Sequence, residues 1–168
     1  MSKTYKIPQA KHSSGFHFGP HIQKTFLQHS VMFDKTAMYY HGDIDQYDIN
    51  KLFGISYGLH HTNSVRFGWR SVGHYSSKIE ILAYCYVDGK RVIEDSDNLF
   101  IAIVDIGKFY TYRINVCDND FTLTIFHNDQ VVGRKEIQHR GIPSWGYKLY
   151  PYFGGNRKAP HDINIYFK

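Results

Sequence analysis

Apolar and polar residues alternate along most of this chain with the two-residue period of a β-strand. The clearest case is residues 63–70, where Val65, Phe67 and Trp69 share one side and polar residues or glycine occupy the other. Successive side chains of a strand point to opposite faces of the sheet, so this pattern is typical of a strand with one buried face. It predicts that Trp69 belongs to the core and not to a binding surface.

The next segment predicts a β-hairpin. Apolar residues alternate with Glu80 and tyrosines over residues 79–87, and Asp88-Gly89 is a dipeptide that favours a type I′ turn into a short return strand at 90–93. An acidic loop at 94–97 follows. Residues 99–106 are nearly all apolar, which predicts a central strand covered on both faces.

The remaining strands are inferred in the same way, and turn-forming residues separate them. Two short strands are expected between residues 21 and 40, and further strands at 51–59, 109–116, 121–127, 131–137, 148–153 and 162–167. Short turns, no long helix and mostly one-sided strands predict an all-β fold, a two-sheet antiparallel jelly-roll sandwich in preference to a closed barrel. The expected organisation is an extended N-terminal arm over residues 1–20 and a single domain over 21–168.

Composition and charge narrow the function classes. The 168 residues include 14 Tyr and 12 Phe, an aromatic content that excludes disorder as the main state. The net charge of +5 is spread along the chain, so nucleic acid binding is not indicated. No run approaches the roughly 20 apolar residues that cross a bilayer, and the start lacks the apolar segment of a signal peptide. We therefore expect cytoplasmic synthesis and no membrane partner, and two buried free thiols at Cys85 and Cys117.

The C-terminal passage carries a family resemblance. In residues 150–167 a proline-aromatic-glycine strand end is followed by a loop and by a closing strand that begins at Asp162. With the hairpin 80–93 and the strands of 109–137, this order resembles the concanavalin A-like lectins and glucanases. The resemblance covers residues 20–168 and implies a jelly roll. The small, Tyr-rich and Ile-rich chain is also similar to small proteins of Bacteroidetes and their phages.

The resemblance implies several activities, because the superfamily contains lectins, hydrolases, lyases and virion modules. Its hydrolases carry a Glu-x-Asp-x-x-Glu pattern, whereas Glu80 stands alone on its strand, so hydrolysis is disfavoured. Its lyases use Arg, Gln, His and Tyr around a uronate carboxylate. Their Arg-x-Glu-x-Arg and Tyr-x-Lys-x-Gly patterns are absent here. The candidate ligand-binding residues on strands that can lie side by side are Arg66, Arg70, Tyr84, Tyr86 and His127.

Three functions stay open at this point. The first is a non-catalytic, lectin-like carbohydrate-binding module that recognises a glycan or a protein surface, because Tyr and Arg suit both partners. The second is a structural phage virion protein, a capsid decoration or fibre component, whose arm docks on neighbouring subunits or on copies of itself. The third is a polysaccharide lyase. Against all three, Tyr84, Tyr86, Tyr110 and Tyr112 can simply pack within the sheets. No catalytic residue and no cofactor is predicted.

Several acidic and histidine residues are candidate metal ligands. Asp43, Asp45 and Asp48 offer oxygen ligands in one loop, but the glycine and terminal glutamate of an EF-hand are missing. The resemblance also implies a calcium position at Asp162. Turn formation is the favoured role of these carboxylates, and the close histidine pairs are not placed on one strand face, so no metal is predicted.

Overall fold

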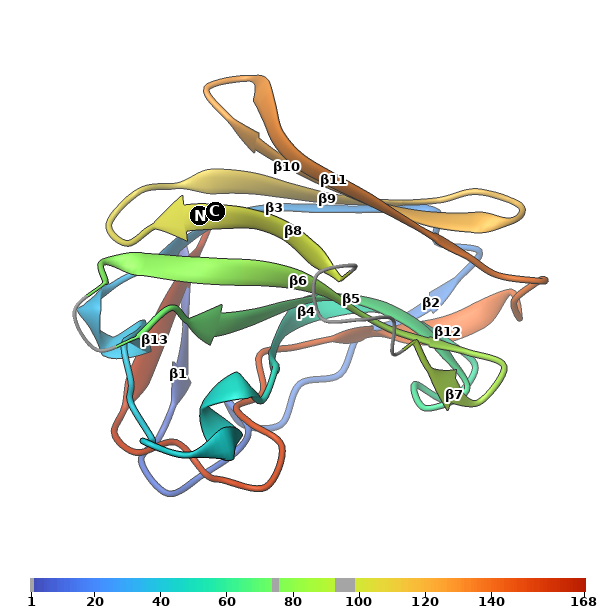
Figure 1. Ribbon diagram of the computed structural model, residues 1–168. Coiled ribbons are helices and arrows are strands. Elements are labelled where there is room, and N and C mark those ends of the chain that lie inside the picture. The colour runs from blue at the N-terminus through green and yellow to red at the C-terminus, as the bar shows by residue number, and fades with distance from the viewer. Residues whose placement is uncertain (1, 74–75, 93–98) are drawn as a thin grey trace.

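Two antiparallel β-sheets pack face to face around one core, as the computed structural model shows (Figure 1); it describes residues 2–73, 76–92 and 99–168. The first sheet has the order β1-β13-β3-β9-β10-β11, and the second has the order β2-β12-β4-β5-β6-β7 with β8 also paired to β6. This arrangement confirms the predicted all-β sandwich.

From β4 to β11 the strand bounds follow the predicted strands closely, whereas β1 and β12 differ from the prediction. The first sheet contains β1 (Lys3–Ile7), β13 (Ile163–Phe167), β3 (Phe26–Phe33), β9 (Tyr110–Val116), β10 (Asp120–His127) and β11 (Gln130–Gln138). The second contains β2 (Pro20–Ile22), β12 (Trp145–Leu149), β4 (Asn50–Tyr57), β5 (Asn63–Ser71), β6 (Lys78–Val87), β7 (Lys90–Arg91) and β8 (Phe100–Asp105). Two short 3-10 helices, η1 (Lys35–Ala37) and η2 (Ile44–Tyr47), lie between β3 and β4.

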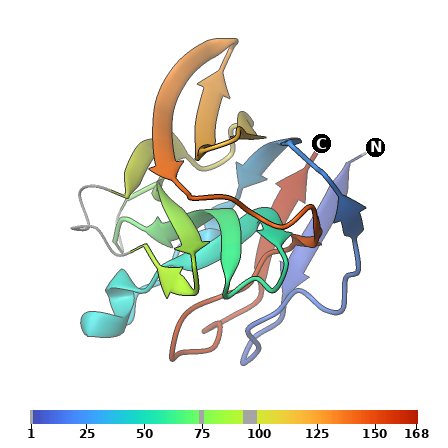
Figure 2. The same cartoon turned by 90° about the vertical axis from the view of Figure 1, so that its right-hand side faces the viewer.

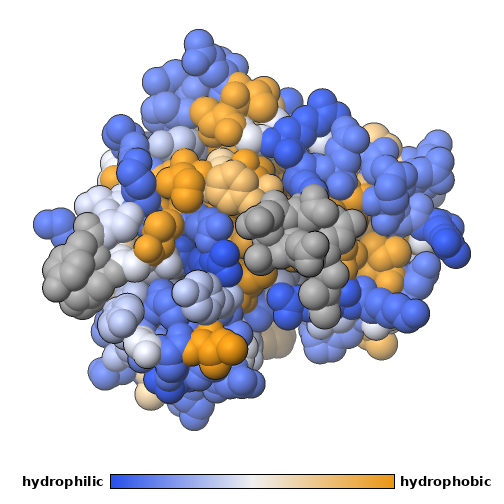
Figure 3. Space-filling view, viewed as in Figure 1, coloured by the Kyte–Doolittle hydropathy of each residue, from blue (hydrophilic) through white to orange (hydrophobic). Residues whose placement is uncertain are grey.

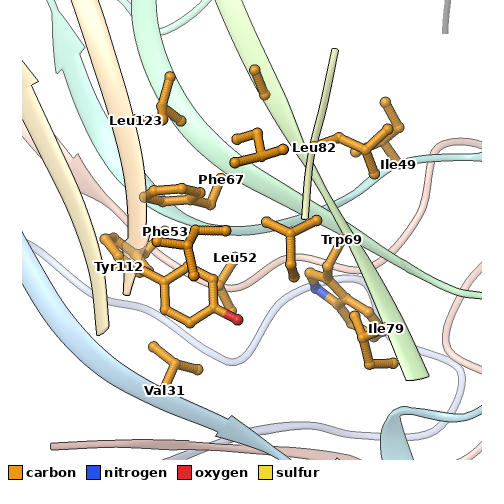
Figure 4. Close-up of a cluster of buried hydrophobic side chains, with 14 of the residues drawn as sticks. Val31, Ile49, Leu52, Phe53, Phe67, Trp69, Ile79, Leu82, Tyr112 and Leu123 are labelled. Atoms are coloured by element: carbon orange, nitrogen blue, oxygen red, sulfur yellow. The ribbon is translucent and has the colours of Figure 1, made fainter. Parts of the chain in front are cut away.

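Aromatic side chains from both sheets meet in the core between the layers (Figure 4). Phe67 and Trp69 of β5 are fully buried, as their alternation predicts. The Phe67 ring centroid lies 5.2 Å from that of Tyr112 on the opposite sheet and 5.5 Å from that of Phe53. Tyr110 and Tyr112 are therefore packing residues. Burying one face of β5 directs its other face outward, where the candidate site lies.

Two hairpins have the predicted turn chemistry. Asp88 and Gly89 adopt positive φ values of 51° and 76°, and Asn128 and Asp129 adopt 49° and 62°. Both central residues of a type I′ turn need positive φ, which these residue types tolerate best. The antiparallel run β9-β10-β11 is thus confirmed. The end of the predicted return strand at residue 93 and the acidic loop at 94–97 lie outside the described residues.

The prediction that residues 99–106 form a central strand covered on both faces was wrong for β8. Among the described strands it pairs only with β6, along Lys78–Leu82, while β7 pairs with the other end of β6. Phe100 and Ile103 of β8 are 40% and 41% exposed. The apolar composition of β8 therefore reflects one buried face and a second face that is partly open at the sheet edge. The surface in Figure 3 likewise carries apolar patches separated by polar side chains.

The N-terminal segment corrects the prediction of an arm over residues 1–20. Strand β1 pairs with β13 from Lys3↔Phe167 to Ile7↔Ile163, and Tyr5 and Ile7 are buried. Figure 2 shows β1 and β13 side by side with both chain ends nearby. With only two apolar residues among polar ones, the strand resembles a loop in sequence.

Two smaller predictions also change. Cys85 is buried but Cys117 is exposed, so the prediction that both thiols are buried was wrong for Cys117. Strand β12 ends at Leu149, earlier than expected, and Tyr152 instead forms isolated bridges to Ser13 and Lys51. Within the described ranges, no helix is long and apolar enough to cross a membrane.

Candidate functional site

The outer face of the second sheet contains a pocket of about 430 Å³. We call it the cationic pocket. Strands β4, β5 and β6, the turn between β4 and β5, and the segment after β12 supply its walls. Its lining residues are Lys51, His60, His61, Ser64, Arg66, Tyr84, Tyr86, Tyr152, Gly154 and Gly155.

Strand register brings the central residues together. Arg66 of β5 is paired with Tyr84 of β6, and Ser64 is paired with Tyr86. Directly opposed residues of antiparallel strands point to the same face with neighbouring Cβ atoms. Because Phe67 and Val65 point into the core, these four side chains form two rows on the outer face.

A glycine on the neighbouring strand makes room for Arg66. Gly54 of β4 is paired with Arg66, and a Cβ atom at Gly54 would lie 2.6 Å from Arg66 Cγ and collide with the carbonyl oxygen of Val65. Glycine in a strand commonly marks such a close approach. The Arg66 side chain therefore lies low against the sheet, where burial lowers its pKa to about 10.

The guanidinium group of Arg66 has a donor without a partner among the described residues. Its Nε is buried and has no hydrogen-bond partner among them. None of the described lining residues is Asp or Glu. A buried charge without a partner is costly, so the arrangement favours an anion in the pocket.

Lys51 adds a second buried cation. Its side chain is buried, and Nζ donates a hydrogen bond of 2.7 Å to the carbonyl oxygen of Gly154. The ammonium group also lies 4.8 Å from the ring centroid of Tyr84 and 5.6 Å from that of Tyr152. Burial, reinforced by the charges of Arg66 and Arg91, lowers the pKa of Lys51 to about 8.

Tyr84 and Tyr86 form the wall on β6. The Arg91 guanidinium lies 4.7 Å from the centroid of the Tyr84 ring, on which Lys51 also packs. The Tyr84 and Tyr86 rings meet edge-on with centroids 6.1 Å apart. Burial raises the pKa of Tyr84, so this phenol keeps its proton at neutral pH. The His61 ring lies 5.2 Å from Tyr86.

The β4–β5 turn is fixed at the rim by Tyr147 of β12. The Tyr147 hydroxyl lies 2.6 Å from His60 Nδ1 and accepts a hydrogen bond from the His60 backbone N–H at 3.3 Å. Ser64 Oγ donates to the His60 carbonyl at 2.7 Å. Burial and the charge of Arg66 lower the pKa of His60, which keeps its imidazole neutral at neutral pH.

Residues near β4 hold the segment that closes the opposite side. The backbone N–H of Gly154 donates to Asn50 Oδ1 at 2.5 Å, and that of Asn156 donates to Asp48 Oδ2 at 3.2 Å. Together with the bond from Lys51 to Gly154, these contacts place the Gly154 carbonyl against the lysine.

Asp43 and Asp45, in the loop before β4, hold the same segment through Arg157. Arg157 Nε donates to Asp45 Oδ2 at 2.7 Å, and the same guanidinium pairs with Asp43. These carboxylates thus have a protein cation as their partner. In the part of the chain that the structure describes, no three His, Cys, Asp or Glu side chains are grouped to hold a metal ion.

Three of the five predicted binding residues line the cationic pocket, namely Arg66, Tyr84 and Tyr86. Arg70 lies on the same strand face, but it pairs with Glu80 and donates to the Tyr47 carbonyl.

His127, the fifth, lies on β10 of the other sheet. There it stacks on Tyr110 with centroids 4.4 Å apart, and its Nδ1 is 3.3 Å from the Phe109 carbonyl oxygen. The structure therefore does not bring His127 to the pocket.

Other lining residues were not predicted from the sequence. Ser64 was visible in the β5 alternation, two residues before Arg66, and His60-His61 was visible as a turn dipeptide. Lys51 carries no such signal. It reaches the outer face next to a β-bulge that shifts the register between Lys51 and Phe53, and a bulge of this kind re-aims a side chain.

Comparisons with known proteins show the fold. No family model matches the chain, and no curated protein matches it. Among solved structures, an alginate lyase from Klebsiella pneumoniae is similar with a TM-score of 0.59 at 13% identity, over 84% of this chain and 56% of that one. The chain thus spans little more than half of that lyase.

Two further solved structures are similar over nearly the whole chain. An alginate lyase from a Chlorella virus has a TM-score of 0.55 at 14% identity, over 98% of this chain and 81% of that one. A Bacteroides ovatus mixed linkage glucan GH16 has a TM-score of 0.51 at 10% identity, over 98% and 77%. These likenesses bear out the predicted two-sheet jelly-roll fold. The likeness to small Bacteroidetes and phage proteins stays a prediction.

Proposed function

We propose that the cationic pocket binds a uronate unit of an anionic polysaccharide and that the protein cleaves the chain there by β-elimination. The observation that carries the proposal is the buried Arg66 guanidinium, whose Nε is unpaired among the described residues, beside Lys51 and two tyrosines. A carboxylate is the anion that suits the planar donor fork of arginine.

β-Elimination needs three groups around the uronate. A cation must neutralise the carboxylate, because negative charge moves onto it when the C5 proton leaves. A base must take that proton. An acid must protonate the glycosidic oxygen O4, which leaves with the neighbouring sugar. The C4–O4 bond breaks, and the electron pair of the C5–H bond becomes the C4=C5 double bond of the new chain end.

The described side chains fit these roles. Arg66 would hold the carboxylate. Lys51, with a pKa of about 8, would supply its neutral amine as the base, since a base works best with a pKa near the working pH. Tyr84, whose pKa is raised, would donate its phenolic proton to O4, and proton exchange through water would restore both groups.

The same lining disfavours a glycoside hydrolase. Hydrolysis of a glycosidic bond generally uses two carboxyl groups flanking it, and the described lining residues include neither Asp nor Glu. Two of the similar solved structures are alginate lyases, and alginate is a polyuronate. This likeness supports the choice of reaction without deciding it.

The test follows the absorbance of the unsaturated product with a panel of polyuronates and a neutral β-glucan. Wild type should form product from at least one polyuronate and none from the glucan. Lys51→Met and Tyr84→Phe should remove the product but keep binding, whereas Arg66→Met should weaken binding itself. Arg113→Met, on the outer face of the other sheet, is the matched control and should act as wild type. Failure of wild type to bind any polyuronate would overturn the proposal.

A non-catalytic glycan-binding module is the second candidate. The observation in its favour is the bond from Lys51 Nζ to the Gly154 carbonyl, which orients the lysine toward the protein. Binding of a polyuronate by wild type with no unsaturated product would select this function. The virion hypothesis stays a prediction.

A further inference from the structure

An exposed tryptophan lies on the same sheet outside the cationic pocket. Trp145 begins β12 and is 53% exposed, and its partner Ile22 on β2 is 80% exposed. Because side chains two residues apart share a strand face, Trp145 points to the side of Tyr147, which contacts His60 in the pocket. Strand β12 lies between β2 and β4 in the sheet (Figure 1).

The indole is backed by a glycine. The Gly58 backbone N–H donates to the Trp145 carbonyl at 2.7 Å, so the two residues are directly opposed. Gly58 has a φ of +68°, and a Cβ atom there would lie 3.9 Å from Trp145 Cζ2 and 3.4 Å from Pro143 Cγ. With no side chain at Gly58, the indole lies over the backbone and keeps much of its surface open.

Sheet geometry places Trp145 at a defined separation from Arg66. Tyr147 is hydrogen-bonded to Ser56 of β4, while Arg66 is paired with Gly54, two residues further along β4. Each two-residue step is about 6.8 Å, so Trp145 lies two steps, about 14 Å along the strands, from the Arg66 row. A single sugar on Arg66 cannot cover that distance, whereas an oligosaccharide can.

We infer that Trp145 is a distal stacking platform for a sugar unit of the same glycan whose uronate occupies the cationic pocket. This inference rests on the proposed function. A glycan is the occupant we commit to because the indole continues the outer face of the pocket through Tyr147 and His60. A flat aromatic face also packs well against the apolar face of a sugar ring.

Fluorescence gives the first test. Of the two tryptophans, Trp69 is buried in the core and Trp145 is exposed, so a ligand that reaches Trp145 should change only its emission. A long polyuronate should shift the emission of wild type, and a uronate trisaccharide should leave it unchanged. In Trp145→Phe the shift should be absent. An equal shift with both ligands would overturn the inference.

Kinetics or binding gives the second test. Trp145→Ala should raise the KM or Kd for the long polyuronate about tenfold and leave the value for the trisaccharide unchanged. Phe26→Ala, an exposed aromatic on the other sheet, is the control and should change neither. If wild type binds no polyuronate, the proposed function fails. If wild type binds both ligands and Trp145→Ala weakens neither or both equally, the platform alone is refuted.

Discussion

Replacing Lys51 by Met should stabilise the protein near neutral pH while abolishing the proposed lyase activity. Burial lowers the pKa of Lys51 from 10.5 to about 8, so the folded protein holds this proton less tightly than the unfolded chain. The difference corresponds to about 3 kcal/mol of lost stability when Lys51 is charged in both states. Met fills a similar volume without the charge, but it leaves the Gly154 carbonyl without its donor, at a cost of about 1 kcal/mol. The expected net gain is about 2 kcal/mol.

The pH dependence separates this cause from ordinary repacking. Below about pH 8 the charged Lys51 destabilises the folded state fully. Between about pH 8 and 10.5 the folded protein has lost the proton and the unfolded chain has kept it, so the stability of wild type rises with pH. Urea unfolding of both proteins at about pH 7 and about pH 10 should show the advantage of Lys51→Met disappearing. Lys90→Met, at an exposed position, is the control. A variant less stable than wild type at neutral pH, or an advantage independent of pH, would show that the buried charge of Lys51 does not destabilise the folded state.

Two further substitutions test the site and the core. Gly54→Ala should displace Arg66, because the new Cβ atom would collide with the backbone carbonyl oxygen of Val65 and lie 2.6 Å from Arg66 Cγ, and should lower polyuronate affinity at least about tenfold in calorimetry; unchanged affinity would contradict this placement of Arg66. Phe67→Ala should lower the free energy of unfolding by about 3–5 kcal/mol in urea titration, since the side chain is fully buried against Tyr112; a loss below about 1 kcal/mol would contradict the tight packing described.

The fold could be predicted where the local pattern is strong. Residues 63–70 alternate strictly because one face of β5 is core and the other is open, and the Asp88-Gly89 turn requires the positive φ that these residues supply. The predictions for the N-terminal arm and for β8 were wrong because the sequence of a strand does not show whether the strand lies at the edge of a sheet. An edge position depends on which strands pair with a given strand, and strands far apart in sequence, such as β1 and β13, supply that partner.

The site could be predicted in part for the same reason. Arg66, Tyr84 and Tyr86 follow from alternation on two consecutive strands, whose pairing the hairpin-rich order implies. Lys51 depends on a bulge and on the Gly154 carbonyl, a contact that spans 103 residues. No local pattern encodes such a contact. His127 was misplaced because alternation gives the face of a strand but not the sheet to which the strand belongs.

The most direct test of anion recognition by the cationic pocket compares one polyuronate with its carboxyl-reduced form, which keeps the backbone and linkages but lacks the charge. Titration calorimetry and product absorbance are measured with wild type on both polymers. We expect binding and unsaturated product with the polyuronate and neither with the reduced polymer, because in our proposal the Arg66 guanidinium binds the carboxylate. Equal binding of the two polymers would contradict the claim that the pocket recognises the anion.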